Sequence, residues 1–254
     1  MSHFVALMYH GISDAEQRSQ YVLSWNDFRQ QLKWLEEARI QAAGFKELEE
    51  LGQAEISPPE VVVTFDDGHS SNLEAATELA QRGMRSIVFV TPKFCIEQSD
   101  FLKPADLRAL HRVADVGTHG FSHRALTKLD QLALRSEVVE SKRWLEDILG
   151  AEVRYMSAPG GFINEHVTEV CLTAGYHLIG NSVEWWNQAP HAGLRTVNRV
   201  ALRRGWPIET FRAIVRRHLS FYVRRRMRSA TLALPKLVLN DAVITRLNKL
   251  RGAA

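Results

Sequence analysis

The chain has 254 residues, of which 45% are hydrophobic and 24% charged; these ordinary values exclude a fibrous or largely disordered protein. No apolar run reaches the length of a membrane span, and the N-terminus lacks the basic start and apolar stretch of a signal peptide, so we expect a cytoplasmic protein, or one bound peripherally at the inner face of the membrane. The formal net charge is +3, but positive charge is concentrated in residues 212–228, which hold seven arginines and no acidic residue.

Hydrophobic patterning predicts strands that alternate with helices along the first two hundred residues. The predicted strands are 4–9, 61–65, 85–90, 113–116, 153–156, 176–179 and 196–202. Capping residues such as Ser24, Asp130 and Asn164, and the stop at Gly150, bound helices between them. Repeated βα units favour a parallel sheet with helices packed outside, either as an open sheet or as a closed barrel.

No linker or repeat divides this pattern, so we expect a single barrel domain over residues 1–228 and a C-terminal helical extension or tail over 229–254. Apolar residues recur at helical spacing between the arginines, which predicts a basic amphipathic helix near 207–228. This helix could pack on the barrel with a solvated basic face, or contact an anionic membrane surface. Nucleic-acid binding is not expected, since no recognised binding motif accompanies the charge.

Chemistry-bearing residues follow two of the predicted strands. Asp66 and Asp67 come directly after an apolar strand, where two neighbouring carboxylates need a compensating charge. His119 and His123 lie in a glycine-containing loop after another strand. The C-terminal ends of barrel strands meet at one rim, so these residues can share a site.

Two imidazoles and one carboxylate leave open coordination positions, as in a catalytic zinc site, although cobalt, nickel and iron also suit these ligands. A cation there would keep one aspartate ionised and leave the other free to act as a base on metal-activated water.

Four stretches carry a resemblance to a known family: "LMYHGI" (7–12), "TFDDG" (64–68), "GTHGFSH" (117–123) and "RYMSAPGG" (154–161). They resemble the polysaccharide deacetylases of carbohydrate esterase family four, also called the NodB-homology domain. The resemblance implies an α/β fold, namely a distorted (β/α) barrel of about seven parallel strands. It also implies metal-dependent removal of acetyl groups from sugars.

Carried over by motif, the resemblance implies that Asp67, His119 and His123 hold the metal and that Asp66 is the general base. The third motif contributes the segment Pro159, Gly160 and Gly161, where the backbone N–H of Gly160 would stabilise the oxyanion.

The chain departs from the usual family pattern at two places. The late "L-x-H-D"-like motif that supplies the acid is absent, but His10 ends an apolar strand in the same way, as in members that look circularly permuted, so we expect His10 to be the acid. Ser157 stands where the family often has an arginine that orients the base. Arg199 is expected to substitute for it, with Arg154 as the alternative.

Trp185 and Trp186 follow the sixth predicted strand and could either line a sugar-binding cleft or pack in the core. We therefore predict a metal-dependent hydrolase that removes an acetyl group from an amino sugar, with a carbohydrate or lipid-linked sugar as substrate. The alternative is a non-catalytic barrel that binds a sugar or a partner protein and retains a relic metal site. Ser157 and the missing late motif favour that alternative.

Overall fold

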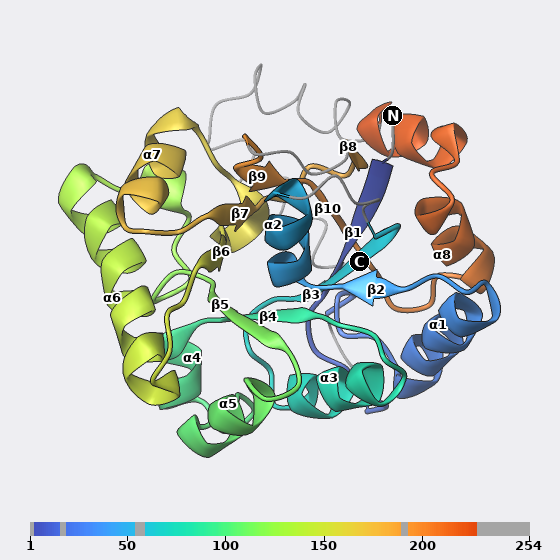
Figure 1. Cartoon of the computed structure of the whole chain (residues 1–254), viewed down its shortest axis with the longest axis horizontal. Helices are drawn as coiled ribbons and strands as arrows, with labels where there is room; N and C mark the ends of the chain where they lie inside the picture. The colour runs from blue at the N-terminus through green and yellow to red at the C-terminus, as the bar shows by residue number, and fades with distance from the viewer. Residues whose placement is uncertain (1–2, 16–18, 54–58, 189–192, 228–254) are drawn as a thin grey trace, which may run out of the picture.

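The structure is a computed structural model that describes residues 3–15, 19–53, 59–188 and 193–227. Its centre is a barrel-like sheet of parallel strands that follow one another in chain order (Figure 1). The last segment closes the sheet, because β9 (Thr196–Val197) pairs with β7 and β10 (Arg199–Ala201) pairs with β1. The six strands between these closing pairs are β1 (His3–Tyr9), β3 (Val61–Phe65), β4 (Ile87–Val90), β5 (Asp115–Thr118), β6 (Tyr155–Ser157) and β7 (Leu178–Gly180). The predicted barrel of about seven parallel strands is confirmed.

Helices surround this sheet (Figure 1) and bury their apolar faces against it. A second apolar cluster fills the inside of the barrel and includes Phe45, whose ring contacts those of Phe89 and Tyr155 edge to face. Phe45 begins α2, so this short helix closes one end of the barrel. The helices are α1 (Trp25–Glu37), α2 (Phe45–Gln53), α3 (Ser71–Gln81), α4 (Pro92–Glu97), α5 (Pro104–Leu110), α6 (Gln131–Leu149), α7 (Glu165–Thr173) and α8 (Ile208–Val215).

Side-chain caps set the helix boundaries where the sequence predicts them. Ser24, Asp130 and Asn164 each accept a hydrogen bond from the backbone N–H three residues later, at 3.0, 2.9 and 2.8 Å. Gly150 ends α6 in the left-handed conformation, with φ of 65°. The starts of α1, α6 and α7 and the end of α6 are therefore confirmed.

Several predicted boundaries are wrong. The strand predicted at 113–116 begins at Asp115, because the N–H groups of residues 113 and 114 turn back to the carbonyl of Leu110. The strand predicted at 196–202 is interrupted at Asn198, whose backbone N–H and C=O both bond to the side chain of Asn187. The sequence analysis also missed α2, α4 and two short strands, β2 (Ala42–Ala43) and β8 (Asn187–Gln188).

The predicted continuous helix over 207–228 is also wrong. Helix α8 ends at Val215, Arg217 has a φ of 56°, and residues 219–227 are helical again. The break lets the chain fold back, since the Tyr222 hydroxyl donates to the carbonyl of Ile214 at 2.9 Å and both side chains are buried. The predicted tail over 229–254 lies outside the described residues. Within the described ranges, none of the helices combines the length and apolarity needed to span a bilayer.

Candidate active site

Asp66 follows β3 and is only 2% exposed. Its charge is compensated by Arg199 of β10, which is fully buried and donates from Nη1 to Oδ1 (2.7 Å) and from Nη2 to Oδ2 (2.9 Å). The Ser157 hydroxyl lies between them, accepting from Arg199 at 2.6 Å and donating to Asp66 at 3.3 Å. The structure thus places an arginine on Asp66, and places Ser157 where that arginine and the carboxylate meet.

Arg154, the alternative to Arg199, lies elsewhere. It precedes β6, and its guanidinium donates to Glu49 of α2 at 2.8 Å and approaches the ring of His177. This cluster belongs to the end of the barrel that α2 covers. Arg154 is therefore not part of the site around Asp66.

The surroundings of Asp66 keep it ionised. Burial raises the pKa of its carboxyl, but the charge of Arg199, with smaller contributions from His119 and His10, outweighs burial and leaves the pKa well below its usual range. For His119, burial dominates and lowers the pKa of the imidazole, although Asp66 and Asp67 oppose this effect. The neutral ring can donate from Nδ1 to the carbonyl of Ser157 (2.9 Å), which leaves the lone pair of Nε2 free for a cation.

Asp67, His119 and His123 form a group whose ligand atoms all lie within 4.8 Å of one another. Oδ1 of Asp67 is 3.6 Å from Nε2 of His119 and 3.3 Å from Nε2 of His123. This oxygen is buried and has no hydrogen-bond partner among the described residues. A buried carboxylate oxygen facing two imidazole nitrogens is satisfied by a divalent cation, so the predicted ligand set fits a metal.

The backbone is strained at two of these three residues. Asp67 has a φ of 76° and His123 a φ of 61°, in the left-handed region that costs a non-glycine residue about 1 kcal/mol or more. Surrounding hydrogen bonds maintain both conformations. The carbonyl of Asp67 accepts from the N–H of Thr91 at 3.2 Å, and the loop before His123 is anchored by Glu137.

Glu137 is the supporting residue that the sequence analysis missed. Its carboxylate accepts from the N–H groups of residues 121 and 122, at 2.8 and 2.9 Å, and from the Ser122 hydroxyl. The side chain is buried on the face of α6 that also carries Leu134, Val138 and Leu145. The signal in the sequence was a glutamate on the apolar face of a helix, because a buried carboxylate needs hydrogen-bond donors beside it.

A cavity of about 400 Å³ opens over the site, and its lining includes Asp66, Asp67, His119, His123 and His10. The structure therefore places His10 in the same cavity as the candidate base and ligands. Its ring lies 5.2 Å from that of Tyr21, and its Nδ1 atom is buried without a hydrogen-bond partner among the described residues.

The segment Pro159, Gly160 and Gly161 reaches the site through Gly160, which lines this cavity and has a φ of 68°. Pro159 is buried and has no N–H to donate. The N–H of Gly161 already bonds to the carbonyl of Ala158 at 2.7 Å. Of the three residues, the structure thus favours Gly160 as a donor toward a ligand.

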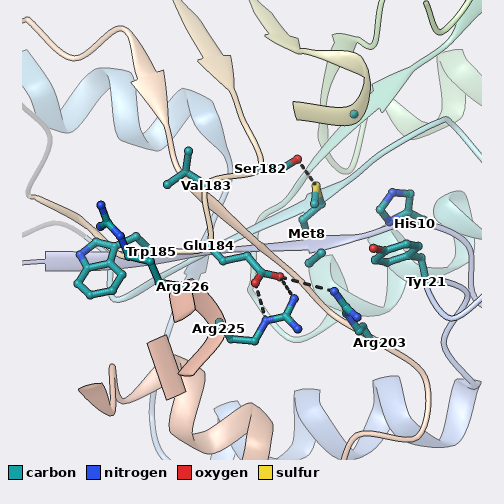
Figure 2. A pocket seen from close by; sticks show the side chains of 12 residues that line it. Met8, His10, Tyr21, Ser182, Val183, Glu184, Trp185, Arg203, Arg225 and Arg226 are labelled. Carbon is teal, nitrogen blue, oxygen red and sulfur yellow. Dashed lines mark hydrogen bonds and ion pairs between the residues drawn. The ribbon is translucent and has the colours of Figure 1, made fainter. Parts of the chain in front are cut away.

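The two tryptophans have different positions. Trp185 lines a second cavity of about 630 Å³ beside the first (Figure 2). Trp186 packs against Trp185 and Tyr222, with ring centroids at 4.3 and 4.9 Å. Trp185 lies as the cleft prediction requires but also packs against Tyr222, with ring centroids at 5.5 Å, whereas Trp186 fits the packing alternative.

The fold and the site define an α/β barrel with a candidate metal centre beside an ion-paired carboxylate at one rim. The family model described as polysaccharide deacetylase matches residues 53–179, half of the chain. The chain belongs to the polysaccharide deacetylase family.

Named relatives agree with this assignment. YxkH of Bacillus subtilis is 25% identical over 214 residues, which cover 82% of this chain and 75% of that protein. The peptidoglycan-N-acetylglucosamine deacetylase of Bacillus cereus is 25% identical over 151 residues, covering 57% of this chain and 67% of its own. The solved structure of the Streptococcus pyogenes deacetylase PplD superposes with a TM-score of 0.76 at 19% identity, over 84% of this chain and 98% of that one, so it shares the barrel fold.

Proposed function

We propose that this protein is a metal-dependent deacetylase that hydrolyses the acetyl group from an amino sugar of a polysaccharide or glycoconjugate. The observation that carries the proposal is the unpartnered Oδ1 of Asp67 between two imidazole nitrogens, beside an Asp66 carboxylate held by Arg199. Membership of the polysaccharide deacetylase family supports it. The name of the Bacillus cereus relative, which acts on peptidoglycan N-acetylglucosamine, supports an N-acetylated sugar as the substrate.

Asp67, His119 and His123 would hold the metal. Two imidazoles and a carboxylate are a common catalytic set for zinc, which is our first choice, and cobalt, nickel or iron(II) would also suit these ligands. A bound divalent cation supplies Lewis acidity, polarising the acetyl carbonyl and lowering the pKa of water.

The chain's own residues would then handle protons and charge. Asp66 accepts the proton of the attacking water, and Arg199 fixes the carboxylate in one orientation through its two parallel hydrogen bonds. As the water oxygen adds to the carbonyl carbon, the N–H of Gly160 donates to the developing oxyanion. The C–N bond breaks, acetate leaves, and His10 gives its proton to the departing amine.

The alternative of a non-catalytic binding barrel loses its main argument. Ser157 at the position of the family arginine suggested a decayed site, but Arg199 brings a guanidinium to Asp66 from another strand. The site keeps a candidate base, candidate ligands and an open cavity.

We further propose a cytoplasmic location and a lipid-linked substrate, with peripheral membrane contact through 207–228. Apolar Leu219 and Val223 are exposed on the 219–227 segment among arginines, which supports the contact. By contrast, Phe211 and Ile214 are buried on the barrel, which limits the surface that remains for lipid. Co-sedimentation with liposomes that contain phosphatidylglycerol tests the contact, and protein that stays in the supernatant would disprove it.

Metal analysis and acetate release together test the main proposal. Elemental analysis is expected to find about one transition metal per wild-type chain and almost none in His119→Ala. His111→Ala is the control, since His111 is an exposed histidine at the end of α5.

Acetate release from N-acetylated oligosaccharides is expected from the wild type and lost in Asp66→Asn. A chain that takes up no metal when zinc, cobalt or nickel is supplied would refute the proposed mechanism. If Asp66→Asn released acetate at the wild-type rate, Asp66 would not be the base.

A further inference from the structure

The second cavity is continuous with the candidate active site. Both cavities are lined by Met8, His10, Tyr21, Gly160 and Ser182. At about 630 Å³ the second cavity is the larger, and it lies within the range of small-molecule sites, roughly 300–1,000 Å³. A glycan whose acetyl group reaches Asp66 can therefore place a neighbouring group in the second cavity.

Arginines dominate the charged lining of this cavity. Arg203 follows β10, and Arg225 and Arg226 come from the 219–227 segment, while among the described residues of the lining the one carboxylate is that of Glu184. Figure 2 shows these side chains along one side of the cavity, with Trp185 at one end and His10 and Tyr21 at the other. Three guanidinium groups face one carboxylate, so the lining has an excess of positive charge.

Glu184 neutralises Arg225 in particular. The two side chains form a bidentate ion pair, in which Nε and Nη2 of Arg225 donate to the two carboxylate oxygens. This pair connects the loop after β7 to the 219–227 segment, and so fixes that segment as a wall of the cavity. Arg203 also pairs with this carboxylate, at 4.0 Å from Nη2 to Oε1, and donates from Nη1 to the side chain of Gln20 at 3.1 Å.

Arg226 is the arginine of the lining that remains available to a ligand. Arg203, by contrast, is held by Glu184 and Gln20, and its guanidinium lies 5.5 Å from the Tyr21 ring centre. The guanidinium of Arg226 lies 5.8 Å from the ring centre of Trp185, and in the part of the chain that the structure describes it forms no ion pair.

Guanidinium groups that lack a carboxylate partner and line a concave site recognise phosphate or carboxylate groups. We propose that the second cavity binds an anionic group of the substrate, a phosphate or a carboxylate carried on or next to the acetylated sugar, through Arg226 at the end of the cavity where Trp185 lies. The substrate class is thus an acidic glycan or a sugar phosphate. This inference rests on the proposed deacetylase function.

Calorimetric binding to the zinc-loaded full chain tests the inference without requiring turnover. The first pair of probes is N-acetylglucosamine 1-phosphate and N-acetylglucosamine, and the second pair is a hyaluronan tetrasaccharide and a chitin tetrasaccharide. We expect the anionic member of at least one pair to bind about five- to tenfold more tightly, as expected for a charge-assisted contact at a partly exposed site. The pair with the larger difference identifies phosphate or carboxylate as the group.

Substitutions at Arg226 assign the effect to the cavity, because this side chain is exposed and its loss leaves the core intact. Arg226→Gln is expected to abolish the preference for the anionic probe, and Arg226→Lys to retain most of it. Arg143→Gln on α6 is the matched control. Arg143 is also an exposed arginine, but it does not line the cavity, so its loss should leave the preference for the anionic probe unchanged. Raising the ionic strength to 0.5 M should weaken only the anionic probes.

Equal binding of anionic and neutral probes would overturn the inference. A preference that survives Arg226→Gln would also overturn it, because the anion would then be bound by a group other than Arg226. Acetate release is measured separately: a chain that prefers anionic probes but releases no acetate refutes the deacetylase function and leaves the anion site standing.

Discussion

Replacing Arg199 by methionine removes the buried partner of Asp66 and should destabilise the fold strongly. Arg199 is fully buried and donates five hydrogen bonds, two of them to Asp66. In Arg199→Met a carboxylate with 2% exposure keeps only the Ser157 hydroxyl from this network. The uncompensated charge is the main cost.

Removing one partner of a buried ion pair costs about 3–5 kcal/mol. The total free energy of unfolding of a domain is about 5–15 kcal/mol, so we expect Arg199→Met to fold but to lose a large part of its stability. In Arg199→Met/Asp66→Asn both charges are gone. The double variant should therefore lose less than the sum of the two single losses, by ~1–3 kcal/mol of coupling.

Urea unfolding followed by tryptophan fluorescence measures these free energies, with chelator present so that metal binding does not contribute. Arg29→Met is the matched control, because Arg29 forms an ion pair with Glu78 but its side chain is 50% exposed. The same substitution there should cause a much smaller loss. If Arg199→Met and Arg29→Met lose the same free energy of unfolding, Asp66 and Arg199 do not act as a buried, coupled pair.

Three further predictions concern residues around the site and the barrel. Glu137→Gln weakens the anchoring of residues 121–122 and should lower metal affinity about 10–100-fold while every ligand remains, as competition with a chelator would measure. Burial raises the pKa of Asp115 to about 6, so the folded state holds this proton more tightly than the unfolded state does. Stability should fall by ~3 kcal/mol as pH rises from about 4 to about 6, and Asp115→Asn should lack that fall in urea titrations. In Gly117→Ala the new Cβ would lie 2.6 Å from the carbonyl oxygen of Tyr155, so the melting temperature should drop by several degrees, and an unchanged value would contradict this packing.

Features encoded within a few residues could be predicted from the sequence. A helix cap is a contact between a side chain and the N–H three residues later, so Ser24, Asp130 and Asn164 revealed their helices directly. The short motifs around Asp66 and His119 revealed the rim in the same way, because barrel topology brings strand ends together.

Features that depend on distant partners could not be predicted. Glu137 acts on a loop fifteen residues earlier, and Arg225 pairs with a carboxylate 41 positions away. The break at 216–218 has a similar origin, because helical spacing continues through it, while the turn is favoured by contacts such as the hydrogen bonds of Tyr222 to Ile214 and of Arg217 to the carbonyl of His3. Helix α2 was missed since its role, closing the barrel, depends on Phe89 and Tyr155 from other strands.

The adjacent aspartates after β3 show how the fold separates two identical side chains. At the end of an extended strand neighbouring side chains point in opposite directions, and the left-handed conformation of Asp67 turns its carboxylate toward the two histidines. Asp66 stays inside against Arg199 with its side chain 3% exposed, while the side chain of Asp67 is 24% exposed. Two carboxylates in different surroundings can take different roles, one as a proton acceptor and one as a ligand. The order of the pair is therefore fixed by the barrel, because the first position pairs with Arg199 and lies near His119 alone, whereas the second lies between both imidazoles.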